Sequence, residues 1–325
     1  MSGWMVLMVV IGAVLLLDLL LHAFAARLVL PFVHYKVPFG VEPSSVDARA
    51  ERISFETTHG LTLRGHLHKS DGPSRGLIIF CPEYDGKHWS ATTYAAALRD
   101  AGYDVLAFDF RNQGESDALP GYEPLHWLTE HEVADVMSAI RYAKSRADLA
   151  ELPIGLFGIS RGGGAALAAA SRCRDLKAIL CEGAYSMESL LLHYALRWAS
   201  LYIPERLMRM LPLWHVRITL GLARWTSQLT RGVRYTLLER ELPRLADRPV
   251  QMIAGGRDTY VAKEITGVLC RRIGSDLCKP LWVVDKAKHN QARKIDPTGY
   301  DRRLLEHFSV LASDVPARQP LSAAG

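Results

Sequence analysis

The chain has 325 residues, which allows one large catalytic domain with appendages and argues against two full-size domains. Apolar residues make up 49% of it and charged residues 22%, a balance typical of globular proteins and not of disordered or fibrous ones. The formal net charge of +5 is too small to indicate a nucleic-acid-binding protein, and we expect no nucleic-acid partner.

The cysteines do not follow a metal-binding or disulfide-framework pattern. There are five of them, without a C-x-x-C pair or zinc-finger spacing, and no histidine pair has a recognised ligand spacing. The sequence therefore predicts no metal site and no cofactor. A disulfide between Cys270 and Cys278 stays open, but buried free thiols in a reducing compartment are favoured. The positions are Cys81, Cys173, Cys181, Cys270 and Cys278.

The first 30 residues are predominantly apolar. Trp4–Leu17 is an unbroken apolar run, which resumes after Asp18 and extends to Leu30 with one histidine and one arginine in it. About 20 apolar residues suffice to span a bilayer. A carboxylate near the membrane centre costs about 2.5–3.5 kcal/mol, which the leucines and valines around Asp18 can offset. We predict that residues 1–30 form a transmembrane anchor helix.

Two other interpretations of this segment stay open. Ala23-Phe24-Ala25 has the small-x-small form of a signal-peptidase site, although no basic residue precedes the apolar run. An apolar helix packed onto the rest of the protein is the second alternative. Basic residues follow the segment and none precedes it, so the positive-inside rule predicts a single-pass protein with a cytoplasmic body. These basic residues are Arg27, Lys36, Arg49 and Arg52, and Phe32, Tyr35 and Phe39 suit an interfacial belt.

Prolines at 31, 38 and 43 disfavour regular structure, so residues 31–50 are a predicted linker. The pattern then becomes alternating. Apolar and polar residues alternate in Ile53–Thr57 and again in Leu61–Leu67, on either side of the His59-Gly60 turn. This alternation predicts a β-hairpin with one solvated face.

After the hairpin, continuous apolar runs alternate with helical stretches. Strands buried on both faces and separated by amphipathic helices predict an α/β fold with a mostly parallel sheet between helices. The predicted strands are Leu77–Phe80, Val105–Phe108, Ile154–Ile159, Ala178–Cys181, Val250–Ala254 and Leu281–Val284. The predicted helices are Ala91–Ala101, Trp127–Ser145, Arg161–Ser171, Lys263–Ile273 and Asp301–Leu311.

One interval interrupts this rhythm. Residues 185–245 contain several helical pieces and no predicted strand, so we interpret them as an insertion within a domain that spans 51–312. The insertion is rich in arginine, tryptophan and leucine. The tail, residues 313–325, carries two prolines and small polar residues and is predicted to be disordered.

A glycine-flanked serine follows the predicted strand Ile154–Ile159. The segment Gly158–Gly162 has the G-x-S-x-G form between a predicted strand and a predicted helix, which is the context of a nucleophile elbow. The helix N-terminus directs free N–H groups toward developing negative charge. Ser160 is therefore the predicted nucleophile, and an incidental serine in a glycine-rich turn is the alternative.

A serine nucleophile needs a base, and the base needs an orienting acid. Asp258 follows the strand Val250–Ala254 in a Gly-Gly-Arg-Asp turn, and Glu182 at the end of the preceding strand is the alternative acid. His289 is the histidine in the loop after the last predicted strand. The order Ser160, Asp258, His289 is that of α/β-hydrolases.

Four motifs in this order resemble the α/β-hydrolase superfamily, particularly its serine-aminopeptidase-like branch. Besides Gly158–Gly162, Gly256–Asp258 and His289, the segment Phe108–Ser116 resembles that branch's F-D-x-R-G-x-G-x-S loop. The resemblance covers about residues 51–311. It implies an α/β-hydrolase fold in which the insertion caps the active site as a helical lid.

The loop after the first parallel strand departs from the family. Relatives carry His-Gly there, whereas this chain reads Cys-Pro-Glu-Tyr-Asp-Gly over residues 81–86. The resemblance implies that this loop and Arg161 supply the two oxyanion N–H groups. Because Pro82 has no N–H, Glu83 is the predicted donor, and the Tyr84 hydroxyl is the alternative. A divergent loop in an inactive relative is a further interpretation.

The predicted function is serine hydrolysis of an ester, thioester or amide through an acyl-enzyme on Ser160. We expect a small-molecule or lipid-like acyl substrate, because a basic, aromatic-bearing insertion suits anionic headgroups or acyl chains. A solvated basic face is the alternative for the insertion. The alternatives for the function are acyl transfer with the same three residues and a membrane-bound scaffold without activity.

Overall fold

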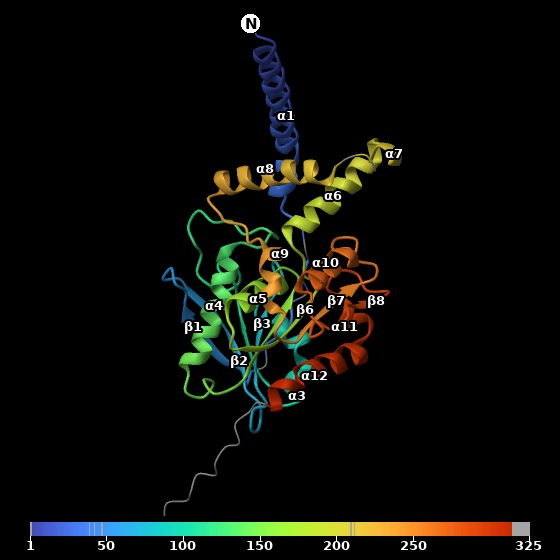
Figure 1. Cartoon of the computed structure of the whole chain (residues 1–325). Coiled ribbons are helices and arrows are strands. Elements are labelled where there is room, and N and C mark those ends of the chain that lie inside the picture. Colours follow the sequence, from blue (N-terminus) through green and yellow to red (C-terminus); the bar gives the residue numbers. More distant parts are fainter. Residues whose placement is uncertain are drawn as a thin grey trace, which may run out of the picture. The chain divides into compact units, whose positions relative to one another are not determined.

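The computed structural model describes residues 2–38, 40–41, 43–46, 48–208, 210 and 212–313 (Figure 1). From residue 314 on, the predicted disordered tail lies outside the described residues. The chain forms two compact units. The helical unit comprises Met1–Val37 and Met187–Tyr235, and the sheet unit comprises Pro38–Ser186 and Thr236–Gly325.

The described part of the sheet unit is built on one eight-stranded, mostly parallel sheet (Figure 1). Its spatial order is β1-β2-β4-β3-β5-β6-β7-β8. Antiparallel pairing joins β1 to β2 and β2 to β4, and all other neighbours are parallel. The strands are β1 (Glu51–Glu56), β2 (Thr62–His68), β3 (Leu77–Cys81), β4 (Asp104–Phe108), β5 (Ile154–Ile159), β6 (Leu176–Glu182), β7 (Val250–Gly255) and β8 (Trp282–Val284).

Helices cover both faces of this sheet, and two apolar cores fill the space between the layers. The central strands β3, β4 and β5 are buried at every residue, which explains their continuous apolar runs. One face carries α4 (Glu130–Ser145), α5 (Arg161–Arg172) and α10 (Lys263–Ile273). The other carries α2 (Ser90–Tyr94), α3 (Ala96–Asp100), α11 (Ala292–Ile295) and α12 (Pro297–Ser313).

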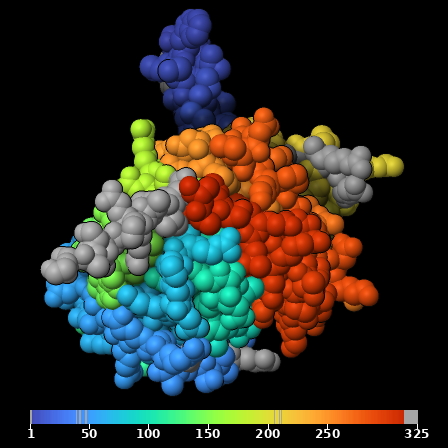
Figure 2. All heavy atoms as spheres, turned by 90° about the horizontal axis from the view of Figure 1, so that it is seen from below, coloured from blue at the N-terminus to red at the C-terminus, as the bar shows by residue number. Residues whose placement is uncertain are grey.

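Helix α12 contacts α3, and this contact reaches the surface, where the red C-terminal residues adjoin the cyan and teal ones (Figure 2).

The single helix predicted over Ala91–Ala101 is two short helices, α2 and α3. They are separated at Ala95, whose φ of −101° and ψ of 13° depart from helical values. Ala95 is fully buried, so packing against the sheet fixes this break.

The predicted β-hairpin corresponds to β1 and β2, which pair from Glu51 with Leu67 to Glu56 with Thr62. The turn contains Gly60 at φ 72°, a conformation that glycine adopts without a steric penalty. Ile53 and Phe55 of β1 are buried while their neighbours are exposed. The alternating pattern of the sequence therefore follows from one buried and one solvated face.

The helical unit consists of the N-terminal helix and most of the insertion. Its helices are α1 (Gly3–His34), α6 (Met187–Tyr202), α7 (Glu205–Met208) and α8 (Leu213–Arg231). The ring nitrogen Nδ1 of His22 lies 2.7 Å from Thr219 Oγ1 of α8, and His34 Nε2 lies 2.9 Å from Ser227 Oγ. By length and composition α1 is long and apolar enough to cross a membrane, and a signal sequence would meet the same description.

The predicted boundary between anchor and linker at residue 30 is wrong. Helix α1 continues through Pro31 and ends at His34, so irregular structure begins at Tyr35. Proline disfavours a helix interior because it lacks an N–H. Here tertiary contacts hold the last turn: Val33 is fully buried, and the Phe32 ring meets the Trp198 ring edge-on at 4.8 Å.

The predicted insertion, 185–245, is also too long at its C-terminal end. Helix α9 (Leu238–Glu241) and the 3-10 helix η1 (Leu242–Leu245) belong to the sheet unit. Leu238, Leu242 and Leu245 are buried in the core that covers one face of the sheet. The chain leaves the sheet unit after Ser186 and returns at Thr236, and the Ser186 hydroxyl donates to Glu239 Oε1 at 2.6 Å.

All five cysteines carry free thiols, including Cys270 and Cys278. Cys81 and Cys181 are fully buried on neighbouring parts of the sheet. Burial raises the pKa of both thiols above the ordinary value, so they remain protonated and pack as small apolar side chains.

Candidate active site

The turn that carries Ser160 joins β5 to α5 in very little space. Ser160 has φ 54° and ψ −119°, a conformation that non-glycine residues rarely adopt. A Cβ atom at Gly158 would lie 2.6 Å from the Gly162 carbonyl oxygen, and one at Gly162 would lie 2.3 Å from the carbonyl oxygens of Cys81 and Pro82. The two glycines therefore permit the turn, and the turn sets the Ser160 side chain at the carboxyl edge of the sheet.

Ser160, His289 and Asp258 are connected by two short hydrogen bonds. Ser160 Oγ lies 2.9 Å from His289 Nε2, and His289 Nδ1 lies 2.7 Å from Asp258 Oδ2. The three side chains come from the turns after β5, β8 and β7. The structure thus brings together the three residues predicted as nucleophile, base and acid.

The Asp258 carboxylate is held by backbone groups on the side away from His289. Its Oδ1 accepts hydrogen bonds from the backbone N–H groups of Tyr260 and Val261, both at 2.8 Å. Charge-assisted bonds of this kind are stronger than neutral ones and fix the orientation of the carboxylate. One oxygen is therefore anchored, and the other faces the imidazole.

Two glycines at the end of β7 allow the loops that carry Asp258 and His289 to approach each other. A Cβ atom at Gly255 would lie 2.5 Å from the Ala287 carbonyl oxygen, and one at Gly256 would lie 2.6 Å from Asp285 Cα. In addition, the Arg257 N–H donates to the Ala287 carbonyl at 2.9 Å. The Gly-Gly-Arg-Asp turn of the sequence therefore has a steric function in joining the two loops.

Glu182, the alternative acid, has other partners. Its Oε1 accepts from the Ala292 N–H at 2.8 Å and its Oε2 accepts from the Tyr300 hydroxyl at 2.8 Å. Burial raises the pKa of Glu182, against the opposing effect of these two hydrogen bonds. Its backbone carbonyl accepts from the Ser160 N–H at 2.7 Å, so Glu182 contributes to the position of the serine turn.

The loop after β3 lies against the start of α5. Its contact is made by the backbone carbonyls of Cys81 and Pro82, which are the groups nearest to a Cβ atom at Gly162. Glu83 in this loop is buried, and its Oε1 accepts a hydrogen bond from the Ser90 hydroxyl at 3.2 Å. Burial raises the pKa of Glu83 to about 7, although its own backbone N–H and the Ser90 hydroxyl lower it. Burial therefore favours the neutral form of this carboxyl beside the start of α5.

The side chain of Arg161 is committed to the interior. It is fully buried, donates from Nη1 to the Leu125 carbonyl at 2.8 Å and lies over the Tyr84 ring at 5.1 Å. The Tyr84 hydroxyl is 3.5 Å from the Pro124 carbonyl oxygen. Arg161 is the first residue of α5, so its backbone N–H has no acceptor within the helix. The backbone, and not the guanidinium, is the group available for a bound oxyanion.

A cleft of about 590 Å³ in the sheet unit opens onto Ser160. This volume lies in the range of small-molecule sites. Ser160, Asp258 and His289 line the cleft, together with Glu83 and Tyr84. Tyr260 also lines it, with its ring 5.3 Å from the His289 ring. Gly40, Val41 and Ser44 of the predicted linker contribute to the wall, a contribution that nothing in their sequence indicated.

The Phe108–Ser116 segment is organised around the buried carboxylate of Asp109. Asp109 accepts from the His88 backbone N–H at 2.7 Å and from the Glu115 N–H at 2.8 Å, and His88 Nδ1 lies 3.0 Å from its Oδ2. A Cβ atom at Gly114, where φ is 53°, would lie 2.0 Å from that oxygen. The motif itself does not indicate His88, which precedes Asp109 by 21 residues and meets it only in the folded chain.

Residues 72–217 match the model of the family described as serine aminopeptidase, S33. The chain is 28% identical over 128 residues to the thiohydrolase aneE of Aspergillus aculeatus, covering 39% of each chain. It is 33% identical over 132 residues to the acyltransferase drtE of Aspergillus calidoustus, covering 39% of this chain and 40% of the relative. The matched region spans about two fifths of the length of these curated relatives.

A solved structure supports the fold over a longer part of the chain. The esterase PF2001 of Pyrococcus furiosus superposes with a TM-score of 0.61 and 21% sequence identity, covering 86% of this chain and 99% of the esterase chain. At this identity the likeness concerns the fold. Together with the mostly parallel sheet and the serine turn after β5, it confirms the α/β-hydrolase fold of the prediction. The chain therefore has the α/β-hydrolase fold, and its residues 72–217 match the model of the serine aminopeptidase family.

Proposed function

We propose that this chain is a serine hydrolase that cleaves a carboxylic ester, thioester or amide through an acyl-enzyme on Ser160. The observation that carries the proposal is the pair of hydrogen bonds from Ser160 Oγ to His289 Nε2, at 2.9 Å, and from His289 Nδ1 to Asp258 Oδ2, at 2.7 Å. A nucleophile, a base and an orienting acid in this connectivity are the requirement for nucleophilic acyl chemistry.

In the first step Ser160 Oγ attacks the substrate carbonyl carbon, and His289 Nε2 accepts the hydroxyl proton. Asp258 keeps the imidazole in the tautomer with a proton on Nδ1 and stabilises the imidazolium. His289 then delivers the proton to the leaving alcohol, thiol or amine. In the second step a water molecule gives a proton to His289 and attacks the acyl carbon, and His289 returns that proton to Ser160 Oγ as the acid is released. Positioned proton transfer of this kind contributes roughly 10²–10⁴-fold to the rate.

The oxyanion formed by the attack needs preorganised donors. We assign this role to the backbone N–H groups of Arg161 and Glu83, which belong to the start of α5 and the loop beside it. The Glu83 N–H contacts its own carboxyl and would exchange that contact for the oxyanion. Each such donor is worth about 10²–10³-fold in kcat. The Tyr84 hydroxyl, which faces the Pro124 carbonyl, is the less favourable alternative.

Labelling with a fluorophosphonate probe tests the nucleophile directly. The wild-type chain should be labelled covalently, and Ser160→Ala should abolish both labelling and turnover. Ser138→Ala is a matched control, because Ser138 is equally buried but lies in α4 and bonds to the Ala134 carbonyl. Undiminished labelling of Ser160→Ala, or no labelling of the wild type, would contradict the proposal and favour an inactive scaffold.

A second pair of variants separates the two acids. Asp258→Asn keeps the shape of the site but favours the wrong imidazole tautomer, so kcat should fall by roughly 10⁴-fold. Glu182→Gln alters only the contacts to Ala292 and Tyr300 and should have a much smaller effect. The reverse ranking would assign the orienting role to Glu182.

Acyl transfer is a second candidate, because one similar protein is described as an acyltransferase. Both reactions share the acyl-enzyme and differ in the nucleophile that attacks it. A panel of acyl esters, acyl-CoA thioesters and aminoacyl amides, each assayed with and without a competing alcohol or amine, distinguishes them. Free acid as the main product supports hydrolysis, whereas a dominant ester or amide product supports transfer.

The helical unit supports attachment to a membrane. Four large apolar side chains of α8 are 47–62% exposed and follow one helical stripe: Trp214, Ile218, Trp225 and Leu229. Its arginines lie on a second face, and Leu220, Ala223 and Ser227 are buried on a third. A helix with an exposed apolar stripe beside a basic face suits a bilayer surface. We assign α1 as the anchor, α8 as an interfacial helix and the cytoplasm as the side of the sheet unit.

Tryptophan fluorescence in vesicles with brominated lipids tests this assignment on the full-length chain. Lipid bromines quench tryptophans that enter the bilayer. Replacing Trp214 and Trp225 by Phe should therefore remove part of the quenched emission. Trp127→Phe is the control, because Trp127 is buried in the sheet unit. Equal quenching before and after the double replacement would exclude contact between α8 and lipid.

A further inference from the structure

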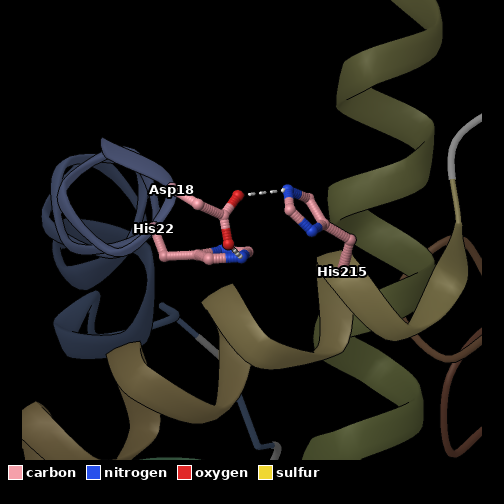
Figure 3. A group of neighbouring side chains, drawn as sticks. All are labelled: Asp18, His22 and His215. Carbon is pink, nitrogen blue, oxygen red and sulfur yellow. Dashed lines mark ion pairs between the residues drawn. The ribbon is translucent and has the colours of Figure 1, made fainter. Parts of the chain in front are cut away.

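Three potential metal ligands from two helices meet within the helical unit. Asp18 and His22 lie one turn apart on α1, and His215 faces them from α8 (Figure 3). Asp18 Oδ2 is 3.6 Å from His22 Nε2, and Asp18 Oδ1 is 3.6 Å from His215 Nε2. One donor atom from each residue lies within 4.8 Å of the other two.

The Nε2 atom of His22, which faces the cluster, is buried and makes no hydrogen bond. The His22 side chain is 5% exposed, and its Nε2 has no partner within hydrogen-bonding distance. Its other nitrogen, Nδ1, is held by Thr219 Oγ1 at 2.7 Å. When Nδ1 donates its proton to that hydroxyl, Nε2 presents a lone pair to the cluster. An outer hydrogen bond that orients the ring in this way is the usual arrangement of metal-bound histidines.

The spacing of the donor atoms fits coordination better than direct hydrogen bonding. A contact of 3.6 Å is too long for a hydrogen bond. Ligands about 2.1 Å from a tetrahedral Zn²⁺ ion are separated from one another by about 3.4 Å. The two histidine–carboxylate separations of 3.6 Å, one to each oxygen of Asp18, come within a few tenths of an ångström of that value.

Charge balance also favours a cation at this place. Asp18 is the one carboxylate in the whole of α1, and the sequence on both sides of it is apolar. Two neutral imidazoles and one carboxylate are a donor set that suits Zn²⁺ and related divalent transition metals. A bound dication would satisfy the Asp18 charge and the two imidazole lone pairs together.

We propose that Asp18, His22 and His215 bind one divalent transition-metal ion of the Zn²⁺ class, with the fourth position open to water. The site joins α1 to α8 and so links the N-terminal helix to the insertion. Thr219 is a positioning residue that acts through His22. The proposal is independent of the hydrolytic site, since none of the residues that line the Ser160 cleft takes part in it.

Metal binding to the untagged full-length chain in detergent tests the proposal. After Zn²⁺ loading and removal of excess metal, we expect one Zn²⁺ per chain, and Co²⁺ in its place should give the visible absorption of a four-coordinate site. His22→Ala and His215→Ala should each weaken binding at least about 100-fold. Thr219→Val should weaken it about 10- to 100-fold. His193→Ala, a histidine of α6 outside the cluster, should bind like wild type.

Fluorophosphonate labelling and circular dichroism of each variant report whether it is folded. If His22→Ala fails to fold, Thr219→Val and Asp18→Asn carry the test. A wild-type chain that binds no Zn²⁺ at micromolar free metal overturns the proposal. Binding that survives in His22→Ala, His215→Ala and Asp18→Asn also overturns it, because the metal would then lie elsewhere.

Discussion

Gly162 is the position where one added methyl group most directly disturbs the proposed oxyanion donors. Its Cβ would lie 2.3 Å from the carbonyl oxygens of Cys81 and Pro82. Because non-bonded heavy atoms are about 3.5 Å apart at their optimum, the loop before Glu83 would have to move by about 1 Å. A displacement of this size at a catalytic group costs about 10²-fold in rate. We therefore expect Gly162→Ala to lower kcat/KM about 100-fold.

Gly164 provides a matched control two residues further along α5. A Cβ atom there would meet Leu128 Cδ2 at 3.4 Å, which is an ordinary contact. Alanine also has a higher helix propensity than glycine by about 1 kcal/mol. Gly164→Ala should accordingly keep nearly full activity and should not unfold at a lower temperature than wild type.

The assay combines hydrolysis of a p-nitrophenyl ester with the second-order rate constant of fluorophosphonate labelling. Both reactions place negative charge on an oxygen that the oxyanion donors must stabilise, so both should slow in Gly162→Ala. Wild-type rates in Gly162→Ala would refute the reasoning, and so would equal losses in the two variants. Rescue of Gly162→Ala by lower temperature alone would indicate a folding defect instead.

Three further predictions concern buried charges and one glycine. Protonated Glu83 stabilises the fold fully below pH 4.5, and this stability, about 3 kcal/mol, is lost as the pH rises to about 7. The unfolding free energies of wild type and Glu83→Gln should therefore diverge between pH 4.5 and about pH 7. Asp135→Ala leaves the fully buried Arg111 guanidinium without its partner and should cost about 3–5 kcal/mol in denaturant unfolding. Gly114→Ala combines a positive φ with a clash against Asp109 and should lower Tm by several degrees.

Each of these predictions has a control in the chain. Ser90→Ala removes a hydroxyl that lowers the pKa of Glu83, so the pH-dependent loss of stability should move to higher pH. Asp175→Ala breaks an exposed pair with Lys144 and should change stability by less than about 1 kcal/mol. Gly60→Ala has a similar positive φ but no atom within 4 Å, so it measures the backbone cost without a clash. If a control variant changes stability in the same way as its test variant, the corresponding explanation is refuted.

The sheet could be predicted from the sequence because its strands are buried on both faces. Continuous apolar runs such as Ile154–Ile159 have the length of buried strands, and glycine-rich turns at their carboxyl ends distinguish them from buried helices. The places of Ser160, Asp258 and His289 followed from this, since active-site residues of such folds occupy the loops after parallel strands. Their catalytic roles stay predictions.

What the sequence could not show depends on contacts between distant residues. Pro31 suggests the end of a helix, yet packing of Val33 and Phe32 extends α1 by one turn. The burial of Glu83 likewise depends on the loop folding onto α5, and periodicity contains no information about it. His215 lies far from Asp18 in the chain, so the cluster in the helical unit could not be recognised, although the i, i+4 spacing of Asp18 and His22 was visible.

The pairing of α1 with α8 has a consequence for synthesis of the chain. Thr219, the partner of His22, follows it by 197 residues. At about 5–20 residues per second, a ribosome needs about 10–40 s to translate that interval. During this time α1 has emerged, with its carboxylate and imidazole, but its partner does not yet exist. The contact between His22 and Thr219 therefore forms only after β1 to β6 have been translated, and until then the polar turn of α1 lacks this partner.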